Sequence, residues 1–369
     1  MHNATDLGGQ VAHAIALKGI SKTYGPVTAL HPTDLSVEKG EFLTLLGPSG
    51  SGKTTLLNLI AGATGPTTGT ILLDGCDITR MPPRERGIGM VFQNYALMPH
   101  MNVFDNVAYP LRARHQPANT IRAKVTEALD RVGLRGFENR KPRQLSGGQQ
   151  QRVGIARCIV YSPTIILMDE PLGALDKNLR EQMQGEIKRL HKDLKTTVIY
   201  VTHDQEEAFN MSDRICLMST GQIAQLGTPD ELYFEPVNEF VADFVGESNL
   251  IEGKVTAANT VMTSDGLTLV VCSTEGHAIG SLVKVLVRPE KIEMIGRSAP
   301  TVTSVRDNAC AGTVAQTSFV GGMTRIAVRC DGGRILRIKT VSSRASDCAP
   351  AGLPVTVSWA ASDTVVLKS

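Results

Sequence analysis

A glycine-rich segment of the sequence combines the residue types that bind phosphate. It comprises Gly47, Pro48, Ser49, Gly50, Ser51, Gly52, Lys53, Thr54 and Thr55. From Gly47 to Thr54 it fits the pattern Gly-x-x-x-x-Gly-Lys-Thr, in which the glycines let successive backbone N–H groups point at phosphate oxygens. Lys53 is then expected to contact the β- and γ-phosphates of a nucleotide, and the Thr54 hydroxyl to bind Mg²⁺. An ordinary glycine-rich turn is the alternative, but the strand-like run before the segment and the helix-like run after it favour nucleotide binding.

Two acidic residues follow a second strand-like run, at Ile165 to Met168. These residues, Asp169 and Glu170, are expected at the carboxyl edge of a parallel sheet, where ligands of such sheets bind. Asp169 suits Mg²⁺ bound through water, and Glu170 suits orienting or deprotonating a water molecule that attacks a phosphate. Capping of a turn would also explain paired acids after a strand. The phosphate-binding segment favours the catalytic interpretation.

His203 and Gln93 also follow strand-like runs. His203 comes directly after the run at Thr197 to Thr202, so it is expected at the same edge as the phosphates, where a neutral imidazole could hydrogen-bond the γ-phosphate or the attacking water. Gln93 follows the run at Gly89 to Phe92, and its amide could help to hold Mg²⁺. A structural role is the alternative for each, because a histidine or glutamine can simply finish a strand.

A second group of small and polar residues precedes the helix-like run Gln150 to Val160. The group consists of Ser146, Gly147, Gly148 and Gln149. The serine and the glutamine have the spacing of a capping box, in which each satisfies a backbone N–H at the start of a helix. Capping leaves the consecutive glycines unexplained, because glycine weakens a helix. We interpret them as exposing the backbone of a helix N-terminus, which with the serine hydroxyl makes a second phosphate receptor.

The elements that must position these residues alternate between strands and helices. The runs at Glu41 to Leu46, Ile165 to Met168 and Thr197 to Thr202 are rich in aliphatic and β-branched residues, as expected for parallel strands buried on both faces. A helix is expected over Thr54 to Ala61. Another lies between the last two runs, with apolar residues at steps of three and four: Leu179, Met183, Ile187, Leu190 and Leu194. This alternation predicts a doubly wound α/β sheet.

The pattern changes to a period of two beyond about Val245. Alternating apolar residues define three strand faces: Val283, Val285 and Val287; Leu336 and Ile338; and Val355, Val357 and Trp359. Glycine, serine and aspartate clusters separate them, as in sheets joined by tight turns. The C-terminal part is therefore expected to be a small all-β domain.

Length and composition narrow the class of protein. A chain of 369 residues is long enough for two domains, and 42% hydrophobic with 20% charged residues is typical of globular proteins. The formal net charge of +2 lacks the concentrated basic excess of a dedicated nucleic-acid binder, so no direct nucleic-acid partner is expected. Residues 1 to 13 have no periodic pattern and are expected to form a loose leader.

The cysteines and the apolar runs indicate the compartment. The seven cysteines are odd in number and contain no Cys-x-x-Cys pair, which argues against a disulfide framework and a zinc site and favours reduced thiols in the core. No run approaches the roughly 18 apolar residues needed to span a bilayer, and the segment from Val11 to Leu17 is too short for a signal peptide. We expect a cytosolic chain that reaches a membrane only through a partner.

This sequence resembles the ATPases of ABC transporters. Four features occur there in the same order: the phosphate-binding segment, the group from Leu145 to Gln149, the strand that ends at Asp169, and the late histidine. In that family two subunits pack head to tail, so that the serine and glycines of one cover the γ-phosphate held by the loop of the other. The resemblance implies that Tyr24 stacks on adenine, although a surface tyrosine in a loop is the alternative. It also implies that Gln93 is the magnesium and coupling glutamine, Glu170 the base and His203 the switch histidine.

The same resemblance implies a fold, ligands and a dimer. Ala174-Leu175-Asp176 is similar to the loop that crosses the dimer, although Gly173 stands where the family usually has serine. ATP and Mg²⁺ are the implied ligands, with the chain expected as a homodimer that sandwiches ATP. The implied fold is an α/β core of the P-loop nucleoside triphosphatase type, a RecA-like mixed sheet with helices on both faces. We expect this ATPase domain at residues 14–240, with an inserted helical subdomain at about 94–157, and an OB-like β-domain at 245–369.

Features outside the catalytic motifs resemble those of importers in particular. The stretch Asn94 to His100 resembles the one that follows the coupling glutamine in importers for small solutes, and the helical subdomain resembles the region that contacts membrane subunits. Val287-Arg288-Pro289-Glu290 resembles the motif of the small β-domain (TOBE type) appended to such ATPases. The implied partners are two integral membrane permease subunits and a separate solute-binding protein, with the chain peripheral on the cytoplasmic face of the inner membrane.

The cargo is left open by this chain alone, because specificity lies in the binding protein and the permease subunits. Overall resemblance favours polyamines such as spermidine and putrescine, with iron(III), 2-aminoethylphosphonate, sulfate and sugars as alternatives. Three other functions compete with import: a soluble ABC-type ATPase acting on nucleic acid or ribosomes, a small-ligand sensor built on the C-terminal domain, and an exporter subunit. The first usually fuses two ATPase halves or inserts a long coiled coil, and the sequence shows neither.

Overall fold

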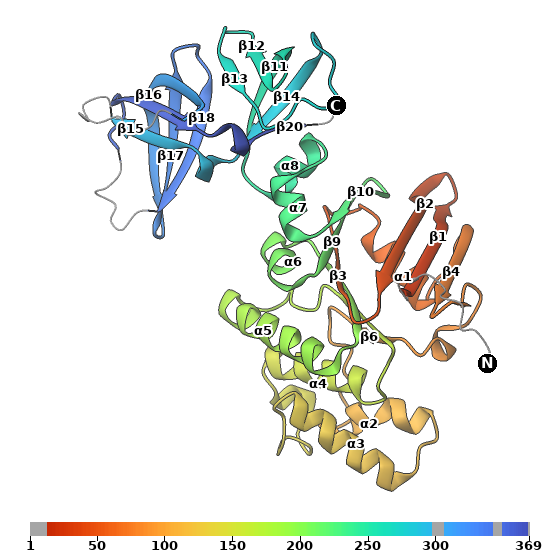
Figure 1. The fold of residues 1–369 in the computed structure, drawn as a ribbon. Helices are drawn as coiled ribbons and strands as arrows, with labels where there is room; N and C mark the ends of the chain where they lie inside the picture. Colours follow the sequence, from red (N-terminus) through yellow and green to blue (C-terminus); the bar gives the residue numbers. More distant parts are fainter. Residues whose placement is uncertain (1–12, 297–305, 342–348, 368–369) are drawn as a thin grey trace, which may run out of the picture. The chain divides into compact units, whose positions relative to one another are not determined.

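The computed structural model of the chain describes residues 13–296, 306–341 and 349–367 (Figure 1). Of the expected leader at residues 1 to 13, only His13 lies within the described residues, and it begins a strand. The chain forms two compact units, the first ending at Pro229 and the second beginning at Asp230. Each unit is built around hydrophobic clusters of its own.

A six-stranded mixed sheet forms the centre of the first unit. In spatial order its strands are β10 (Gln222–Gly227), β9 (Arg214–Ser219), β3 (Phe42–Leu46), β8 (Thr197–Thr202), β7 (Ile165–Asp169) and β6 (Gly89–Val91). All neighbours pair in parallel except β10, which runs antiparallel to β9. The three runs predicted as buried strands are β3, β7 and β8, and their carboxyl ends meet at one edge of the sheet.

The side chains of these strands alternate between two hydrophobic clusters, one on each face of the sheet. Along β3, Phe42 packs in one cluster and Leu43 in the other, and along β7 Leu167 and Met168 divide in the same way. A strand buried on both faces has no polar side to alternate with, which is why these runs are apolar throughout. The expected α/β core with a mixed sheet is therefore confirmed.

One face of this sheet is covered by helix α1 (Lys53–Ala61) and by a second, antiparallel sheet. In spatial order the second sheet consists of β2 (Val27–Glu38), β1 (His13–Tyr24), β4 (Thr68–Leu73) and β5 (Cys76–Asp77). The sequence patterns did not predict this sheet. Register shifts between Leu17 and Ile20 and between Ile20 and Lys22 interrupt the period of two along its longest pairing.

The other face of the central sheet is covered by helices (Figure 1). The helices next to the sheet are α4 (Gly147–Ile159), α5 (Lys177–Leu194) and α6 (Gln205–Met211). Helices α2 (Val103–Ala113) and α3 (Ala118–Arg131) pack against α4 and extend the same hydrophobic cluster. Short 3₁₀ turns occur at Pro83–Glu85 and Pro142–Gln144. The apolar stripe predicted for α5 faces this core, with Met183, Ile187 and Leu190 buried.

The second unit contains two five-stranded antiparallel sheets. The first consists of β13 (Thr268–Val270), β12 (Thr260–Thr263), β11 (Asn249–Ala257), β14 (Leu282–Val287) and β20 (Thr364–Leu367). The second consists of β15 (Glu293–Gly296), β19 (Pro354–Trp359), β16 (Asn308–Val320), β17 (Met323–Cys330) and β18 (Ile335–Val341). All three strand faces predicted from alternating residues pack into one cluster, in which Trp359 is fully buried. The expected all-β, OB-like domain is confirmed.

Two short helices open the second unit: α7 (Pro229–Phe234) and α8 (Glu239–Val245). Arg288 fastens them to the strands, because its buried guanidinium donates hydrogen bonds to the carbonyl oxygens of Tyr233, Ala242 and Glu247. The division between the compact units falls between Pro229 and Asp230, at the start of α7. The sequence predicts the ATPase domain to end at residue 240 and the β-domain to begin at 245, and this stays a prediction. The arginine of the importer-like motif thus has a structural role within its own unit.

The cysteines divide between core and surface. Cys158, Cys216 and Cys330 are buried, whereas Cys76 and Cys272 are exposed, and all of them are free thiols. The expectation of core thiols is therefore wrong for Cys76 and Cys272, which lie on a short edge strand and in a loop. Of the remaining cysteines, Cys310 is half-buried and Cys348 lies outside the described residues.

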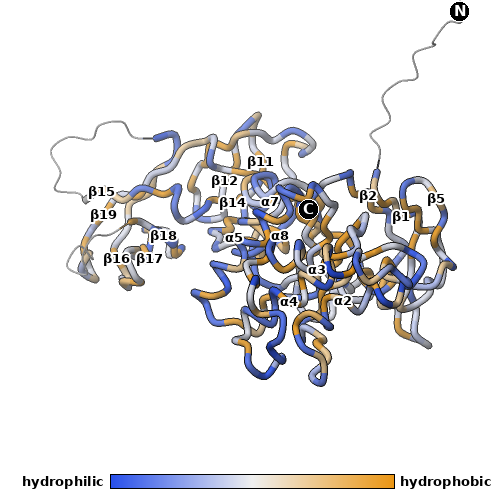
Figure 2. Tube along the Cα trace, turned by 90° about the horizontal axis from the view of Figure 1, so that it is seen from below, coloured by the Kyte–Doolittle hydropathy of each residue, from blue (hydrophilic) through white to orange (hydrophobic). Residues whose placement is uncertain are grey.

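Within the part of the chain that the structure describes, no helix combines the length and the apolar character that crossing a membrane requires. Figure 2 shows hydrophilic and hydrophobic residues interspersed along the helices of the first unit. This interspersion is typical of helices that bury one side against a sheet and expose the other to water.

Candidate functional site

The phosphate-binding segment forms a tight turn between β3 and α1. Gly47 (φ 150°) and Gly52 (φ 100°) have backbone angles that favour glycine. Space also requires glycine at both positions: a Cβ atom on Gly47 would lie 2.2 Å from the carbonyl oxygen of Met218, and one on Gly52 would lie 2.9 Å from that of Ala29. The segment is therefore pressed against β9 and β2, and its backbone takes the curled form that the pattern predicts.

Lys53 turns back over this loop. Its side chain is buried, and Nζ donates hydrogen bonds to the carbonyl oxygens of Gly47 at 2.8 Å and Pro48 at 2.9 Å. Burial lowers the pKa of Lys53, while the nearby carboxylates of Glu170 and Asp169 oppose that shift. The other predicted members of the loop differ in exposure: Pro48, Ser49, Gly50 and Thr54 are exposed, Gly52 and Thr55 are half-buried, and Ser51 is buried.

Asp169 and Glu170 lie at the carboxyl end of β7, as expected. Burial raises the pKa of Asp169, and the charge of Glu170 adds to this effect while that of Lys53 opposes it. Glu170 has a left-handed backbone (φ 43°), and its N–H donates to the carbonyl oxygen of Val201 on β8 at 3.0 Å. A left-handed conformation at a residue with a side chain costs on the order of 1–3 kcal/mol and is typical of functional sites. With this backbone, the Glu170 carboxylate lies within reach of His203 and Gln93.

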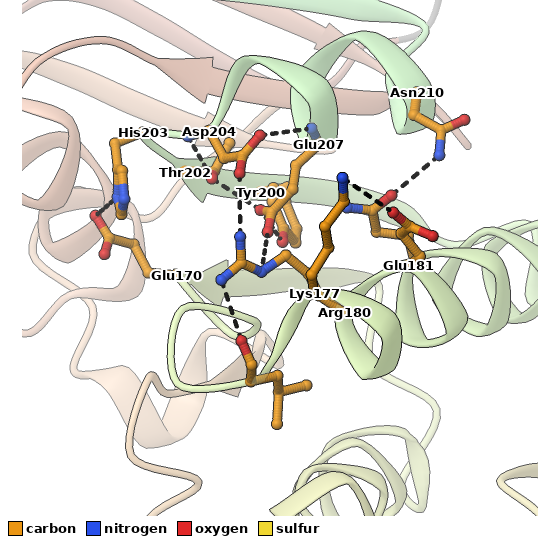
Figure 3. A network of polar contacts seen from close by, with 12 residues as sticks. Glu170, Lys177, Arg180, Glu181, Tyr200, Thr202, His203, Asp204, Glu207 and Asn210 are labelled. Atoms are coloured by element: carbon orange, nitrogen blue, oxygen red, sulfur yellow. Dashed lines mark hydrogen bonds and ion pairs between the residues drawn. The ribbon is translucent and has the colours of Figure 1, made fainter. Parts of the chain in front are cut away.

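His203 and Gln93 converge on Glu170 from the ends of two other strands. Nδ1 of His203 lies 3.3 Å from Oε1 of Glu170 (Figure 3). Nε2 of Gln93 lies 3.5 Å from Oε2 of the same carboxylate. Because the His203 side chain is 61% exposed, it has room to turn toward a bound ligand. The structure therefore brings together Lys53, Asp169, Glu170, Gln93 and His203, which are far apart in the sequence.

The Ser146 turn, which we define as residues 146–149, begins helix α4. The Ser146 side chain accepts a hydrogen bond from the N–H of Gln149, and the Gln149 side chain accepts one from the N–H of Ser146, so the capping box is present. Ser146 and Gly147 are exposed and Gly148 is buried. A Cβ atom on Gly148 would lie 2.9 Å from Cδ1 of Leu179. Gly148 thus has a packing reason that the sequence did not reveal, whereas Gly147 leaves the helix N-terminus open to a ligand.

Tyr24 lies at the end of β1, where the β1–β2 hairpin turns. Its ring is about half-exposed, and the ammonium group of Lys22 lies 4.9 Å from the ring centroid. On the partner strand β2, Ala29 is the residue that packs against Gly52 of the phosphate loop. The hairpin that carries Tyr24 is therefore the one that borders the loop, as a position beside the adenine of a nucleotide requires.

The loop from Gly173 to Asp176 runs from β7 to helix α5. Asp176 is exposed and caps α5 by accepting a hydrogen bond from the N–H of Leu179 at 3.0 Å. A Cβ atom on Gly173 would lie 3.5 Å from the carbonyl oxygen of Glu170, which is an ordinary contact. Serine would therefore fit there, and nothing in the structure explains the glycine.

A polar network beside the site, centred on Arg180 of α5, was not identified from the sequence (Figure 3). Nη1 of Arg180 lies 3.3 Å from Oδ2 of Asp204, and Nη2 donates to the carbonyl oxygen of Leu175 at 3.1 Å. Nε lies 3.7 Å from Oε1 of Glu207. The available signal was indirect: Asp204 directly follows the predicted switch histidine, and Arg180 lies in the first turns of the helix that Asp176 caps.

Glu207 is the most buried acid of this network. Its Oε2 accepts hydrogen bonds from the hydroxyl groups of Tyr200 at 2.7 Å and Thr202 at 2.8 Å. Burial raises the pKa of Glu207 in spite of these bonds and of the charge of Arg180. Tyr200 and Thr202 belong to β8, the strand that directly precedes His203. The network is therefore attached to the same strand as the site.

Two family models match the chain. The model described as "ABC transporter" matches residues 30–173, a range that includes the phosphate loop, Gln93, the Ser146 turn and the Asp169–Glu170 pair. The model described as "TOBE domain" matches residues 285–367, within the second unit. Both units of the chain therefore have known relatives.

Similar proteins include three described as "Spermidine/putrescine import ATP-binding protein PotA". The one from Rubrobacter xylanophilus is 44% identical over 96% of this chain and 93% of its own length. The one from Thermobifida fusca is 44% identical over 97% of this chain and 94% of its own. The one from Acetivibrio thermocellus is 47% identical over 86% and 88%, respectively. In each case the likeness extends across both units.

Two solved structures of a bacterial ABC transporter cassette resemble the first unit. One is a dimeric structure, and the other is a dimeric post-hydrolysis state bound to ADP and Pi. Each is 36% identical to this chain, with a TM-score of 0.53, and covers 58% of this chain and 98% of the cassette.

Proposed function

The chain belongs to the ATP-binding subunits of ABC importers that carry a C-terminal TOBE domain, and we propose that it hydrolyses ATP to drive the import of polyamines such as spermidine and putrescine. ATP hydrolysis follows from membership of the family. The cargo rests on one observation, the likeness across both units to spermidine/putrescine import ATP-binding proteins.

In the proposed mechanism, the side chains at the carboxyl edge of the sheet bind and polarise ATP. Lys53 leaves the carbonyl groups of its own loop and contacts the β- and γ-phosphates, joined by the loop's backbone N–H groups. Glu170 takes a proton from the water that attacks the γ-phosphorus, and His203 hydrogen-bonds the γ-phosphate. Tyr24 stacks on the adenine. The contribution of the protein is mainly preorganised charge, as for other phosphoryl transfers.

Thr54, Gln93 and Asp169 are the residues that would hold Mg²⁺. They offer an exposed hydroxyl, an exposed amide and a carboxylate, which are the hard oxygen donors that Mg²⁺ takes together with phosphate oxygens and water. The raised pKa of Asp169, caused by burial and by Glu170, fits a carboxylate that gains from a nearby cation. When bound, Mg²⁺ neutralises part of the phosphate charge.

The proposed assembly places two copies of the chain head to tail around ATP. Each copy offers its exposed Ser146 hydroxyl and the N–H groups at the start of α4 to the γ-phosphate held by its twin. Asp176 lies in the loop that would cross between them. The solved cassette structures that resemble the first unit are dimers, which supports this assembly.

The chain is proposed to act at the cytoplasmic face of the cell membrane with partners that it does not contain. Two integral membrane permease subunits would contact the helices between residues 94 and 157, and a separate solute-binding protein would deliver the cargo. The importer relatives support this arrangement. ATP-driven closure of the two copies would then pull on the permease subunits, and hydrolysis would release them.

An uptake assay tests the cargo. Proteoliposomes that contain the chain, the permease subunits encoded beside its gene and their solute-binding protein are supplied with radiolabelled spermidine or putrescine. We expect uptake that requires ATP and is lost with Glu170→Gln. Uptake of iron(III), 2-aminoethylphosphonate, sulfate or a sugar without any uptake of polyamines would overturn the cargo assignment and leave the ATPase assignment intact.

A further inference from the structure

We propose that Arg180 is a positioning residue that couples the His203 side of the site to the Ser146 turn of the same chain. This inference rests on the proposed ATP-dependent dimer and names the contact through which one half of the site affects the other. The inference is based on the guanidinium of Arg180, which contacts two separate segments of the chain: it pairs with the carboxylate of Asp204 (Figure 3) and donates a hydrogen bond to the carbonyl oxygen of Leu175.

The Asp204 contact connects Arg180 to the γ-phosphate side of the site. Asp204 directly follows His203, its N–H donates to the Thr202 hydroxyl at 3.0 Å, and its Oδ1 accepts from the N–H of Glu207 at 3.2 Å. Oδ2, the second carboxylate oxygen, lies near Arg180. Because Asp204 is joined to His203 by a peptide bond, a shift of the backbone at His203 is expected to change the distance between Oδ2 of Asp204 and the guanidinium.

The Leu175 contact connects Arg180 to the turn that covers the ATP of the twin. Leu175 is 6% exposed, and its Cδ2 lies 3.5 Å from the position of a Cβ atom on Gly147. Leu179, one residue before Arg180, packs still more tightly, because its Cδ1 lies 2.9 Å from the position of a Cβ atom on Gly148. The Ser146 turn therefore packs against Leu175 and Leu179. A shift of the loop that contains Leu175 is expected to move the start of α4.

A purely structural role, neutralising the buried Glu207, does not require this geometry. Two hydroxyl groups already bind Oε2 of Glu207 at 2.7 and 2.8 Å, and the guanidinium lies 3.7 Å from Oε1, beyond hydrogen-bond distance. The closer contacts of Arg180 are with Asp204 and Leu175. The planar guanidinium donates to the carboxylate and the carbonyl from two different nitrogens in a fixed fork, whereas a lysine ammonium would have to reach both from a single nitrogen.

The coupling predicts how the site behaves during turnover. When His203 engages the γ-phosphate, Arg180 holds the Leu175 loop in the position that presents the Ser146 turn to the twin. When the γ-phosphate leaves, His203 returns to Glu170 and the same contacts release the turn. Without Arg180, a chain still binds nucleotide in its own phosphate loop. Nucleotide binding there no longer positions the Ser146 turn of the same chain, which contacts the ATP of the twin.

The test measures dimer formation and single-chain binding separately. In the Glu170→Gln background, light scattering gives the ATP concentration for half-maximal dimerisation, and a fluorescent ADP analogue gives the affinity of the phosphate loop. We expect Arg180→Met to raise that ATP concentration about tenfold with an unchanged ADP affinity. Arg189→Met removes an exposed guanidinium from the same helix and is expected to change neither value.

A mutant cycle distinguishes coupling from loss of stability. Asp204→Asn keeps the cap of α6, since asparagine caps helices as well as aspartate does, but removes the charge that faces Arg180. We expect Asp204→Asn and Arg180→Lys to act in the same direction as Arg180→Met, and the double variant Arg180→Met/Asp204→Asn to be no weaker than Arg180→Met alone. The single conservative variants carry the test if Arg180→Met folds poorly.

Failure of the proposed dimer and failure of the proposed role of Arg180 give different results in these experiments. If Glu170→Gln alone fails to dimerise with ATP, the proposed dimer is wrong and the inference ends with it. If Glu170→Gln dimerises but Arg180→Met does so at the same ATP concentration, or if ADP affinity falls equally, or if the two substitutions add, Arg180 does not couple the two sides and only the inference is overturned.

Discussion

Oε1 of Glu170 lies 3.3 Å from Nδ1 of His203, and this contact joins the ends of the adjacent strands β7 and β8 at the phosphate loop. The left-handed backbone of Glu170 directs its carboxylate to this position, and the exposure of His203 leaves the imidazole able to move to a ligand. The pair therefore combines the proposed base, whose backbone is constrained, with an exposed histidine side chain.

Replacing the base is expected to stop turnover without preventing binding. Glu170→Gln removes the carboxylate that accepts a proton from water, which should lower the rate of phosphate release by about 100-fold or more. Because the amide has the same shape, nucleotide affinity should be unchanged. Phosphate release and binding of a fluorescent ATP analogue measure the two quantities, and hydrolysis at the wild-type rate would remove Glu170 from its assigned role.

Removing the buried cation is expected to weaken binding itself. Lys53→Ala deletes the ammonium group inside the loop and should lower nucleotide affinity roughly 10- to 100-fold, as for a lost charge-assisted hydrogen bond worth about 1.5–3 kcal/mol. Lys39→Ala, at an exposed lysine paired with Asp74, is the matched control and should not alter affinity. Calorimetry with ATP compares them, and equal affinities for both variants would count against the loop.

The two glycines of the Ser146 turn should differ in their tolerance of alanine. A Cβ atom on Gly148 meets Leu179 at 2.9 Å, whereas one on Gly147 meets Leu175 at an ordinary 3.5 Å. Gly148→Ala should destabilise the first unit by about 1–3 kcal/mol, as overpacking does. Gly147→Ala should leave its stability nearly unchanged. Urea unfolding of the two variants is the comparison, and equal stabilities would show that Leu179 adapts freely.

The positions of the proposed catalytic residues could be predicted from the sequence because these residues follow apolar strands. Fully apolar runs indicated parallel strands, and parallel strands bring their carboxyl ends to one edge, so Glu170 and His203 were expected together before their contact was known. The spacing of Ser146 and Gln149 likewise identified a capping box that the structure contains. In each case a local pattern carried the information.

Features that depend on long-range packing could not be predicted in this way. The antiparallel sheet of β1, β2, β4 and β5 has register shifts that hide its period. Arg180 belongs to no motif, and its role depends on a carbonyl and a carboxylate that only the fold brings together. The hydrogen bonds of Arg288 to the segment of α7 and α8 likewise depend on carbonyl oxygens of residues distant in the sequence.

Thiol reactivity should divide the cysteines by burial. Burial raises the pKa of Cys158 and of Cys216 to about 12, so at pH 8 only about one thiol in ten thousand would be ionised even if reagent reached it. Cys76 and Cys272 are exposed and should react first with iodoacetamide. Mass spectrometry of peptides from briefly labelled native protein measures this order, and early labelling of Cys158 or Cys216 would contradict the described core.

In the proposed dimer, ATP is held between the loop of one copy and the Ser146 turn of another. The most direct measurement is the mass in solution, by light scattering, of Glu170→Gln and of Glu170→Gln/Ser146→Arg with ATP and Mg²⁺. We expect a dimer for Glu170→Gln and a monomer for the double variant, because the arginine side chain fills the space at the Ser146 turn. Both variants should bind a fluorescent ADP analogue equally well. A monomer in the first case, or a dimer in both, would contradict the proposed dimer.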